Sequence, residues 1–202
     1  MRNLETPTYK VALYGALSGL GSALLVTALQ RQYEITALID DLNALTARPG
    51  LRCKLGMPSD AVAVSQSVAG MDAVICLLSE LPTPHQRSDF SLQFSTLLAL
   101  LDGLEVAGVK RLLVVDDHTW LKQPQPLLPV PAQHLQERLL ASSVAWTLIE
   151  APAHSAPLSV EVCADGQPQA QPLLRFAAAL LDEARLSLHV HERVHIDEGD
   201  GR

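Results

Sequence analysis

The pattern of apolar and polar positions shows two kinds of segment that alternate along the chain. Short runs rich in Val, Ile and Leu predict strands at residues 9–14, 34–39, 51–55, 72–78, 111–115 and 144–149. Apolar residues at helical spacing predict helices over 19–32, 60–69, 89–107, 131–142 and 173–184. This order predicts an α/β fold, a single doubly wound, mostly parallel sheet of Rossmann-like type with helices on both faces.

Turn and capping residues place the ends of several predicted elements. Ser59 is the expected N-cap of the helix over 60–69, and Gly108 is the expected end of the helix over 89–107. Residues 119–131 hold four prolines and predict an irregular loop. In the tail, two further strand-like pieces lie near 159–163 and 188–196. We expect one domain over residues 1–202.

A glycine-rich turn joins the first predicted strand to the first predicted helix. Gly15, Gly19 and Gly21 follow the spacing G-x-x-x-G-x-G. Such a turn brings a pyrophosphate against backbone N–H groups at a helix N-terminus. Gly15 would allow the turn, Gly19 the close approach of phosphate, and Gly21 the packing of helix on strand. The predicted phosphate-binding residues are Gly15, Leu17, Ser18, Gly19, Leu20 and Gly21.

An acidic pair ends the second predicted strand. Asp40 lies 19 residues after Gly21, and Asp41 follows it. A carboxylate there can accept hydrogen bonds from the ribose hydroxyls of an adenosine and would repel a 2′-phosphate, which favours NAD over NADP. The alternative is that the pair only starts a turn and caps the next segment.

Other candidate residues lie at the carboxyl ends of later strands, where such sheets bind ligands. Leu78 and Ser79, after the fourth strand, complete the candidate cofactor set. Asp116, Asp117 and His118 follow the fifth strand, where a carboxylate beside an imidazole can form an acid/base pair. The alternative is a strand-ending Asp that caps a loop. Residues 1–115 would be the dinucleotide-binding part, and 116–202 the substrate side.

Two further groups carry weaker signals. His189, His191 and His195 would share one face if 188–196 were an extended strand, but no carboxylate or Cys completes a ligand set, so we predict no metal site. His85 and Arg87, in the loop after the fourth strand, either meet an anionic substrate or lie in a solvated loop.

Composition narrows the partners. The 202 residues carry a net charge of −7, which disfavours nucleic acid and anionic membranes. No apolar run approaches the roughly 20 residues of a membrane span, and the N-terminus does not resemble a signal peptide. Cys53, Cys76 and Cys163 are far apart, as expected of reduced thiols in a cytoplasmic protein.

Several motifs together resemble the atypical short-chain dehydrogenase/reductase superfamily, in its NmrA-like, NAD(P)H-binding branch. They are YGALSGLG at the start, GMDAVICLL, EVAGVKRLLVVDD, LLASSVAWTLIEAP and the tail PLLRFAAALLDEA. The resemblance covers nearly the whole chain. It implies a Rossmann fold and NAD(P) binding, and it does not identify a substrate.

The departures from this family concern its chemistry. Ser18 stands where the extended and atypical members usually have their middle glycine, and Gly56-Met57 stands where relatives often carry an adenine-contacting Asp. Asp116-Asp117 replaces the family's catalytic Ser, and the Tyr-x-x-x-Lys places fall on Pro129 and Gln133. Without a Tyr–Lys pair, ordinary alcohol–ketone hydride transfer lacks its acid/base groups.

Two classes of function remain open. One is an oxidoreductase or an epimerase/dehydratase-like protein, with His118 as proton carrier and Asp116 or Asp117 orienting its ring. The other is a non-catalytic, dinucleotide-binding redox sensor or interaction protein. In both, NAD is the expected cofactor. The sequence names no substrate or protein partner and leaves a homodimer open.

Overall fold

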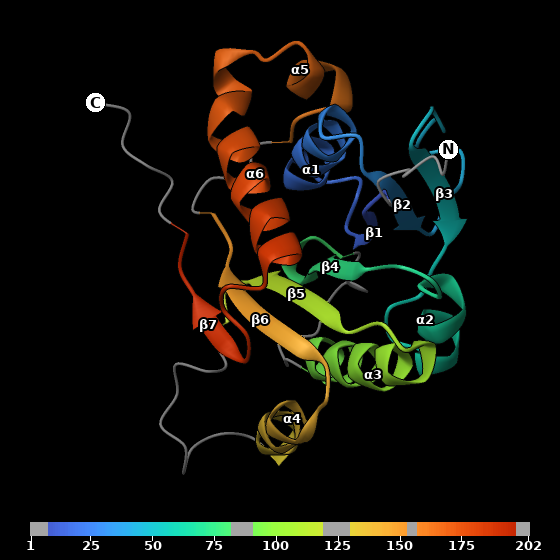
Figure 1. Ribbon diagram of the computed structural model, residues 1–202, viewed down its shortest axis with the longest axis vertical. Coiled ribbons are helices and arrows are strands. Elements are labelled where there is room, and N and C mark those ends of the chain that lie inside the picture. Colours follow the sequence, from blue (N-terminus) through green and yellow to red (C-terminus); the bar gives the residue numbers. More distant parts are fainter. Residues whose placement is uncertain (1–7, 82–90, 119–129, 153–156, 197–202) are drawn as a thin grey trace, which may run out of the picture.

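The computed structural model describes residues 8–81, 91–118, 130–152 and 157–196. Over these residues the strands form one seven-stranded sheet in the order β3-β2-β1-β4-β5-β6-β7 (Figure 1). Each neighbouring pair is parallel. The predicted α/β, Rossmann-like fold is confirmed.

The strands begin and end close to the predicted positions. They are β1 (Lys10–Tyr14), β2 (Glu34–Ile39), β3 (Leu51–Leu55), β4 (Ala73–Leu77), β5 (Arg111–Asp116), β6 (Ala145–Glu150) and β7 (Glu192–Val194). Every residue of β4 is buried, as its apolar run predicts. Among the described residues of the tail, only Glu192–Val194 forms a strand, so the prediction of an extended 188–196 is wrong.

Helices cover both faces of the sheet, as Figure 1 shows. They are α1 (Gly19–Gln30), α2 (Ala61–Ser67), α3 (Ser91–Ala107), α4 (Val130–Ala141), α5 (Val160–Ala164) and α6 (Gln171–Leu186), with the short 3₁₀ turns η1 (Leu78–Glu80) and η4 (Pro168–Ala170). Helices α1, α5 and α6 lie on one face, and α2, α3 and α4 lie on the other. The pleat of β1 joins the two cores, with Val11 and Leu13 on one side and Ala12 and Tyr14 on the other.

Two local predictions are wrong. Asp60, rather than Ser59, caps α2, because its carboxylate accepts from the amides of Val62 and Ala63. Residues near 159–163 form the helix α5, because Ser159 caps it and Val160 and Cys163 bury the same face. The prediction at Gly108 is confirmed, since α3 ends at Ala107 and Gly108 has φ +72°.

Helices α2 and α3 pack closely at a glycine. A Cβ on Gly103 of α3 would lie 2.6 Å from Val64 Cβ and 2.7 Å from the Ala61 carbonyl oxygen. The missing side chain is therefore what allows the two helices to approach.

A buried ion pair lies at the amino ends of the strands, at the start of β5. The Arg111 guanidinium donates to Glu183 Oε1 at 2.6 Å and to the Ala145 carbonyl at 2.8 Å. Glu183 of α6 also accepts from the backbone N–H of His189 at 2.9 Å and lies 2.8 Å from its Nδ1. Burial lowers the pKa of Arg111, and the Glu183 carboxylate opposes this effect.

The helices show no candidate for a membrane span. Among the described residues, none combines the length and the apolar character needed to cross a bilayer.

Candidate functional site

The turn after β1 is built by a serine and two glycines. Gly15 has φ +83°, a conformation that suits glycine, and a Cβ there would lie 2.8 Å from Leu77 Cβ. A Cβ on Gly21 would lie 2.3 Å from the Gly15 carbonyl oxygen. Ser18 caps α1, because its Oγ accepts from the Gly21 amide at 3.0 Å and donates to the Gly15 carbonyl at 2.9 Å. The predicted role of Gly15 in the turn is confirmed. Gly21 allows α1 to pack against the turn after β1, and the role of Gly19 in the approach of a phosphate stays a prediction.

The first amides of α1 remain available. Among the described residues, no acceptor is recorded for the N–H groups of Gly19 and Leu20, whereas those of Gly21 and Ser22 bond to Ser18. These two donors lie at the positive end of the helix dipole, where an anion is favoured. The turn can therefore receive one phosphate without losing its own cap.

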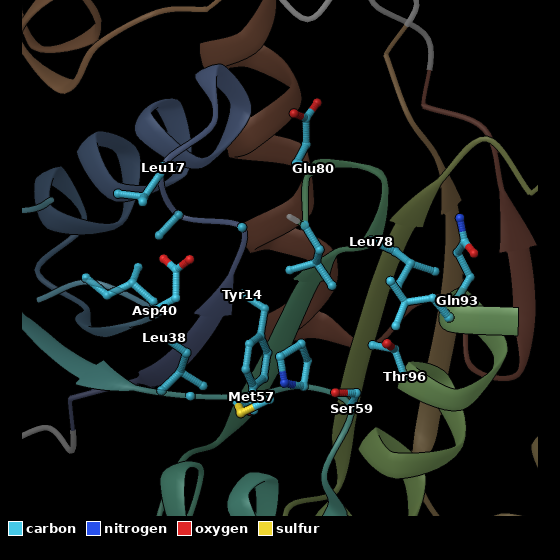
Figure 2. Close-up of a pocket in the computed structure, with 17 residues that line it drawn as sticks. Tyr14, Leu17, Leu38, Asp40, Met57, Ser59, Leu78, Glu80, Gln93 and Thr96 are labelled. Carbon is cyan, nitrogen blue, oxygen red and sulfur yellow. The ribbon is translucent and has the colours of Figure 1, made fainter. Parts of the chain in front are cut away.

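A cavity of about 270 Å³ opens beside this turn, at the carboxyl ends of β1, β2 and β4, and its lining side chains are drawn in Figure 2. Its lining is mostly apolar and comes from the turns after β1, β2, β3 and β4 and from the start of α3. The lining residues are Tyr14, Gly15, Ala16, Leu17, Leu38, Ile39, Asp40, Gly56, Met57, Pro58, Ser59, Leu78, Glu80, Leu81, Leu92, Gln93 and Thr96. The shape and mixed lining are typical of a small-molecule site.

The acidic pair after β2 divides into two roles. Asp40 lines the cavity. Asp41 does not line it, and its Oδ1 accepts from the backbone amide of Asn43 at 2.9 Å and from the Asn43 side chain at 3.0 Å. The turn interpretation therefore holds for Asp41, and Asp40 is the carboxylate that a ligand can reach.

The floor of the cavity is held by a tyrosine. Tyr14 is fully buried, its hydroxyl lies 3.2 Å from Ser67 Oγ, and burial raises the pKa of its phenol to about 12. Gly56 lies against it, since a Cβ there would lie 3.3 Å from the Tyr14 ring and 2.9 Å from Leu38 Cβ. Gly56 and Met57 stand where relatives often carry an adenine-contacting Asp, and here they form part of the cavity wall.

A residue at the far end of the cavity carries an unsatisfied polar atom. Gln93 Oε1, on α3, is buried and has no hydrogen-bond partner among the described residues. Gln93 and Thr96 lie across the cavity from Asp40 in Figure 2. Buried polar groups normally find a partner, and none of the described residues supplies one here. Only the folded structure brings Gln93 to the cavity.

A second cavity continues from the first on the other side of the turn. It is lined by Leu17, Ser18, Gly19, Glu80, Pro157, Leu158 and Ser159. Leu17 and Glu80 line both cavities. Sequence reasoning missed Glu80, although its place directly after β4 and the candidate Leu78-Ser79 could have indicated it.

The charges of the two linings have one sign. Among the described residues, the ionised side chains are the carboxylates of Asp40 and Glu80, and neither lining contains Lys, Arg or His. Any anionic ligand there must therefore be held by uncharged donors, which are backbone amides and the hydroxyl and amide side chains of the linings.

Of the remaining cofactor candidates, one lines a cavity and two do not. Leu20 is buried in the core against the sheet, and Leu78 lines the first cavity. Ser79 is exposed and lines neither cavity.

Asp116, Asp117 and His118 lie at the end of β5 but do not line either cavity. His118 is 0% exposed, its Nε2 lies 3.0 Å from the Ile149 carbonyl oxygen, and its Nδ1 lies 3.9 Å from Asp116 Oδ2. Burial lowers the pKa of His118 to about 4, so the ring is neutral at pH 7.

The tail histidines contact α6, the residue before β6, and the last residue of β6. His189 contacts Glu183, His191 lies 3.0 Å from the Val144 carbonyl through Nε2, and His195 lies 2.9 Å from Glu150 Oε2. Within the described residues, no group of three or more potential ligands could hold a metal ion. His85, Arg87 and the prolines at 124, 126 and 129 fall outside those residues.

Comparisons with known proteins agree with this fold. Residues 15–155 match a protein family described as NAD(P)H-binding. A candidate epimerase from Bacteroides thetaiotaomicron has 22% identity and a TM-score of 0.63, with 94% of this chain and 96% of that chain covered. A Rossmann-fold NAD(P)-binding family protein from Shigella flexneri has 15% identity and a TM-score of 0.61, with 97% and 98% covered.

A third similar structure contains a dinucleotide. The Bordetella bronchiseptica enzyme WbmH, solved in complex with NAD+, has 16% identity and a TM-score of 0.60, with 94% of this chain and 75% of that chain covered. At these identities, the three structures show a common fold.

Proposed function

The chain belongs to the NAD(P)H-binding family, and from this premise we propose that its two cavities hold one nicotinamide dinucleotide, NAD in preference to NADP. The adenosine half occupies the cavity beside Asp40. The pyrophosphate lies against the amides of Gly19 and Leu20, and the nicotinamide half continues toward Glu80 and Leu158.

The observation that carries this proposal is the position of Asp40 in the cavity wall. A carboxylate at the tip of β2 accepts from both hydroxyls of an adenosine ribose. It also repels a 2′-phosphate, and no basic side chain among the described lining residues offsets that repulsion. The NAD+ bound to the similar WbmH enzyme supports the same assignment.

The available polar groups fit a dinucleotide. Two amides at a helix N-terminus suit a phosphate, Asp40 suits a ribose, and the unsatisfied Gln93 Oε1 suits an N–H donor of the ligand. When bound, the nicotinamide supplies hydride chemistry. The residues of this chain bind and orient the cofactor.

The test compares two neighbouring carboxylates. Asp40→Asn and Asp41→Asn remove the same charge one residue apart, and only Asp40 lines the cavity. We expect the parent protein to bind NAD+ at least about tenfold more tightly than NADP+, because a carboxylate and a phosphate repel each other at short range. Asp40→Asn should narrow this ratio and Asp41→Asn should preserve it, as measured by calorimetry. Equal affinities of the parent for both cofactors would contradict the preference.

For the chemistry, we propose an oxidoreductase or epimerase/dehydratase-like protein that works without a Tyr–Lys pair. Gln133 carries no charge with which to lower the pKa of a phenol, and His118 is the proposed proton carrier beside Asp116 and Asp117. General acid–base help is worth about 10²–10⁴ in rate, so turnover of simple alcohols and ketones should be poor.

One observation favours the non-catalytic alternative, a dinucleotide-binding sensor. His118 is fully buried on a backbone carbonyl and lines neither cavity. NADH oxidation should be screened across carbonyls and quinones with the parent protein and His118→Ala. A rate that falls in the variant supports the enzyme, an unchanged rate removes His118 from it, and clear binding without any rate supports the sensor.

We also propose that the protein is located in the cytoplasm. The three cysteines are unpaired, which suits the reducing cytoplasm that we propose.

A further inference from the structure

Glu80 is an acidic side chain that lines the expected path of the nicotinamide half. It lines both cavities, together with Leu17, and it ends the short η1 turn after β4. In Figure 2 Glu80 lies toward the top of the view, apart from Asp40, which lies lower and near Leu38. Among the described residues, it is the one ionised side chain lining the second cavity.

The position follows from the length of a dinucleotide. If Asp40 holds the adenosine and α1 holds the pyrophosphate, the other half must leave the turn on the side away from Asp40. The second cavity begins at Leu17, Ser18 and Gly19 and extends to Pro157, Leu158 and Ser159. Glu80 therefore borders the space in which the nicotinamide ribose and ring would lie.

The two redox states of the cofactor differ in this half by one charge. The oxidised ring is a pyridinium cation, and the reduced dihydropyridine ring is neutral. The pyrophosphate and both riboses are identical in the two forms, so the repulsion between Glu80 and the phosphates cancels in their ratio. A carboxylate that faces the ring therefore favours the oxidised form.

We propose that Glu80 makes this site selective for the oxidised dinucleotide, NAD+, over NADH. This inference rests on the proposed function and adds a redox preference to it. No Lys, Arg or His among the described lining residues neutralises Glu80. Within the described part of the chain, Glu80 also has no hydrogen bond or ion pair that would have to be broken first.

The expected preference is modest and depends on salt. Unit charges about 6 Å apart in a largely solvated site correspond to about three- to tenfold in affinity. Because Glu80 is partly exposed, the preference should shrink as ionic strength rises. For a two-electron couple, a tenfold preference lowers the reduction potential of the bound cofactor by about 30 mV.

The experiment measures dissociation constants of NAD+ and NADH by calorimetry at low and high salt. Glu80→Gln keeps the size and hydrogen-bonding oxygen of the side chain and removes its charge. Glu192→Gln, on the exposed strand β7, removes the same charge outside both cavities. We expect the ratio of NADH to NAD+ dissociation constants to fall about three- to tenfold in Glu80→Gln and to stay unchanged in Glu192→Gln.

Any other outcome contradicts either the redox preference or the proposed function. If Glu80→Gln weakens both forms equally, Glu80 is only a ribose ligand and the inference is wrong. An unchanged ratio in Glu80→Gln also contradicts it, while dinucleotide binding itself stands. If the folded parent binds neither form, the proposed function fails, and the redox preference fails with it.

Discussion

Single atoms at the site differ in how well their hydrogen-bonding capacity is met. Tyr14 OH and Ser18 Oγ have partners within the chain, whereas Gln93 Oε1 is buried with none among the described residues. An unsatisfied buried oxygen costs stability in the unliganded protein, and we expect it to gain a partner when a ligand binds beside Gln93. Stability and affinity should therefore respond in opposite directions when it is removed.

Gln93→Leu tests this opposition. We expect the variant to unfold at higher urea, with a gain of about 1 kcal/mol, because a desolvated polar atom is lost. We also expect NAD+ binding to weaken about tenfold, the loss of roughly one hydrogen bond. Gln66→Leu, on the exposed side of α2, is the matched control and should leave the affinity unchanged. Tighter binding by Gln93→Leu would exclude Gln93 as a ligand contact.

His118 should make stability depend on pH. Its folded-state pKa of about 4 lies below the ordinary value of 6.5, so the unfolded chain takes up a proton more readily. Stability should therefore fall as pH decreases from about 6.5 to about 4, by about 3 kcal/mol, and level off below.

The check for His118 uses an asparagine. His118 has φ +50°, a left-handed conformation that asparagine tolerates better than most residues. Urea unfolding of the parent and of His118→Asn between pH 7.5 and 4 should show a steeper loss in the parent. Parallel curves would mean that another group carries the pH dependence.

At the scale of elements, close helix contacts depend on missing side chains. Gly21 lets α1 approach the Gly15 carbonyl, and Gly103 lets α3 approach Val64 of α2. In an exposed helix, Gly→Ala stabilises by about 0.5–1 kcal/mol. At a contact of 2.6 Å the sign should reverse.

Gly103→Ala should destabilise the protein by about 1–3 kcal/mol, because Val64 and the Ala61 carbonyl must move to admit the methyl group. Ser95→Ala, on the exposed side of the same helix, is the control and should change stability by less than about 0.5 kcal/mol. A Gly103→Ala variant as stable as the parent would show that α2 and α3 adjust freely.

Periodicity was enough to predict most elements because buried strands and helices leave clear apolar patterns. It failed for α5, where V-E-V-C alternates like a strand and the Ser159 cap decides for a helix. It also failed at 188–196, where His191 takes φ +61° and interrupts the extended backbone. Gly15, Gly21 and Asp40 could be placed from spacing, whereas Gln93 reaches the cavity only through the packing of α3 on the sheet.

At the scale of the whole molecule, the carboxyl ends and the amino ends of the parallel strands carry different features. The cavities lie at the carboxyl ends of the strands, and the buried ion pair between Arg111 and Glu183 lies at their amino ends. This pair ties β5, α6 and the segment at His189 together. Breaking one partner leaves an uncompensated buried charge.

Glu183→Gln and Arg111→Met should each cost about 3–5 kcal/mol of stability, and the double variant should cost less than the sum, because neither charge is then left alone. The exposed pair Arg138–Asp102 offers a control cycle, with a coupling of at most about 1 kcal/mol. Both cycles are measured by urea unfolding. Strict additivity at Arg111 and Glu183 would mean that the pair contributes no coupling.

The serine cap on α1 has a kinetic consequence. Since Ser18 already holds the turn in place, an arriving dinucleotide has no loop to fold before it docks. Its association should then follow one concentration-dependent phase in stopped-flow, near the usual range of about 10⁵–10⁷ M⁻¹s⁻¹ for a preformed site. In Ser18→Gly the turn would have to become ordered each time a dinucleotide binds. The association rate constant should therefore fall, while the dissociation rate constant changes less.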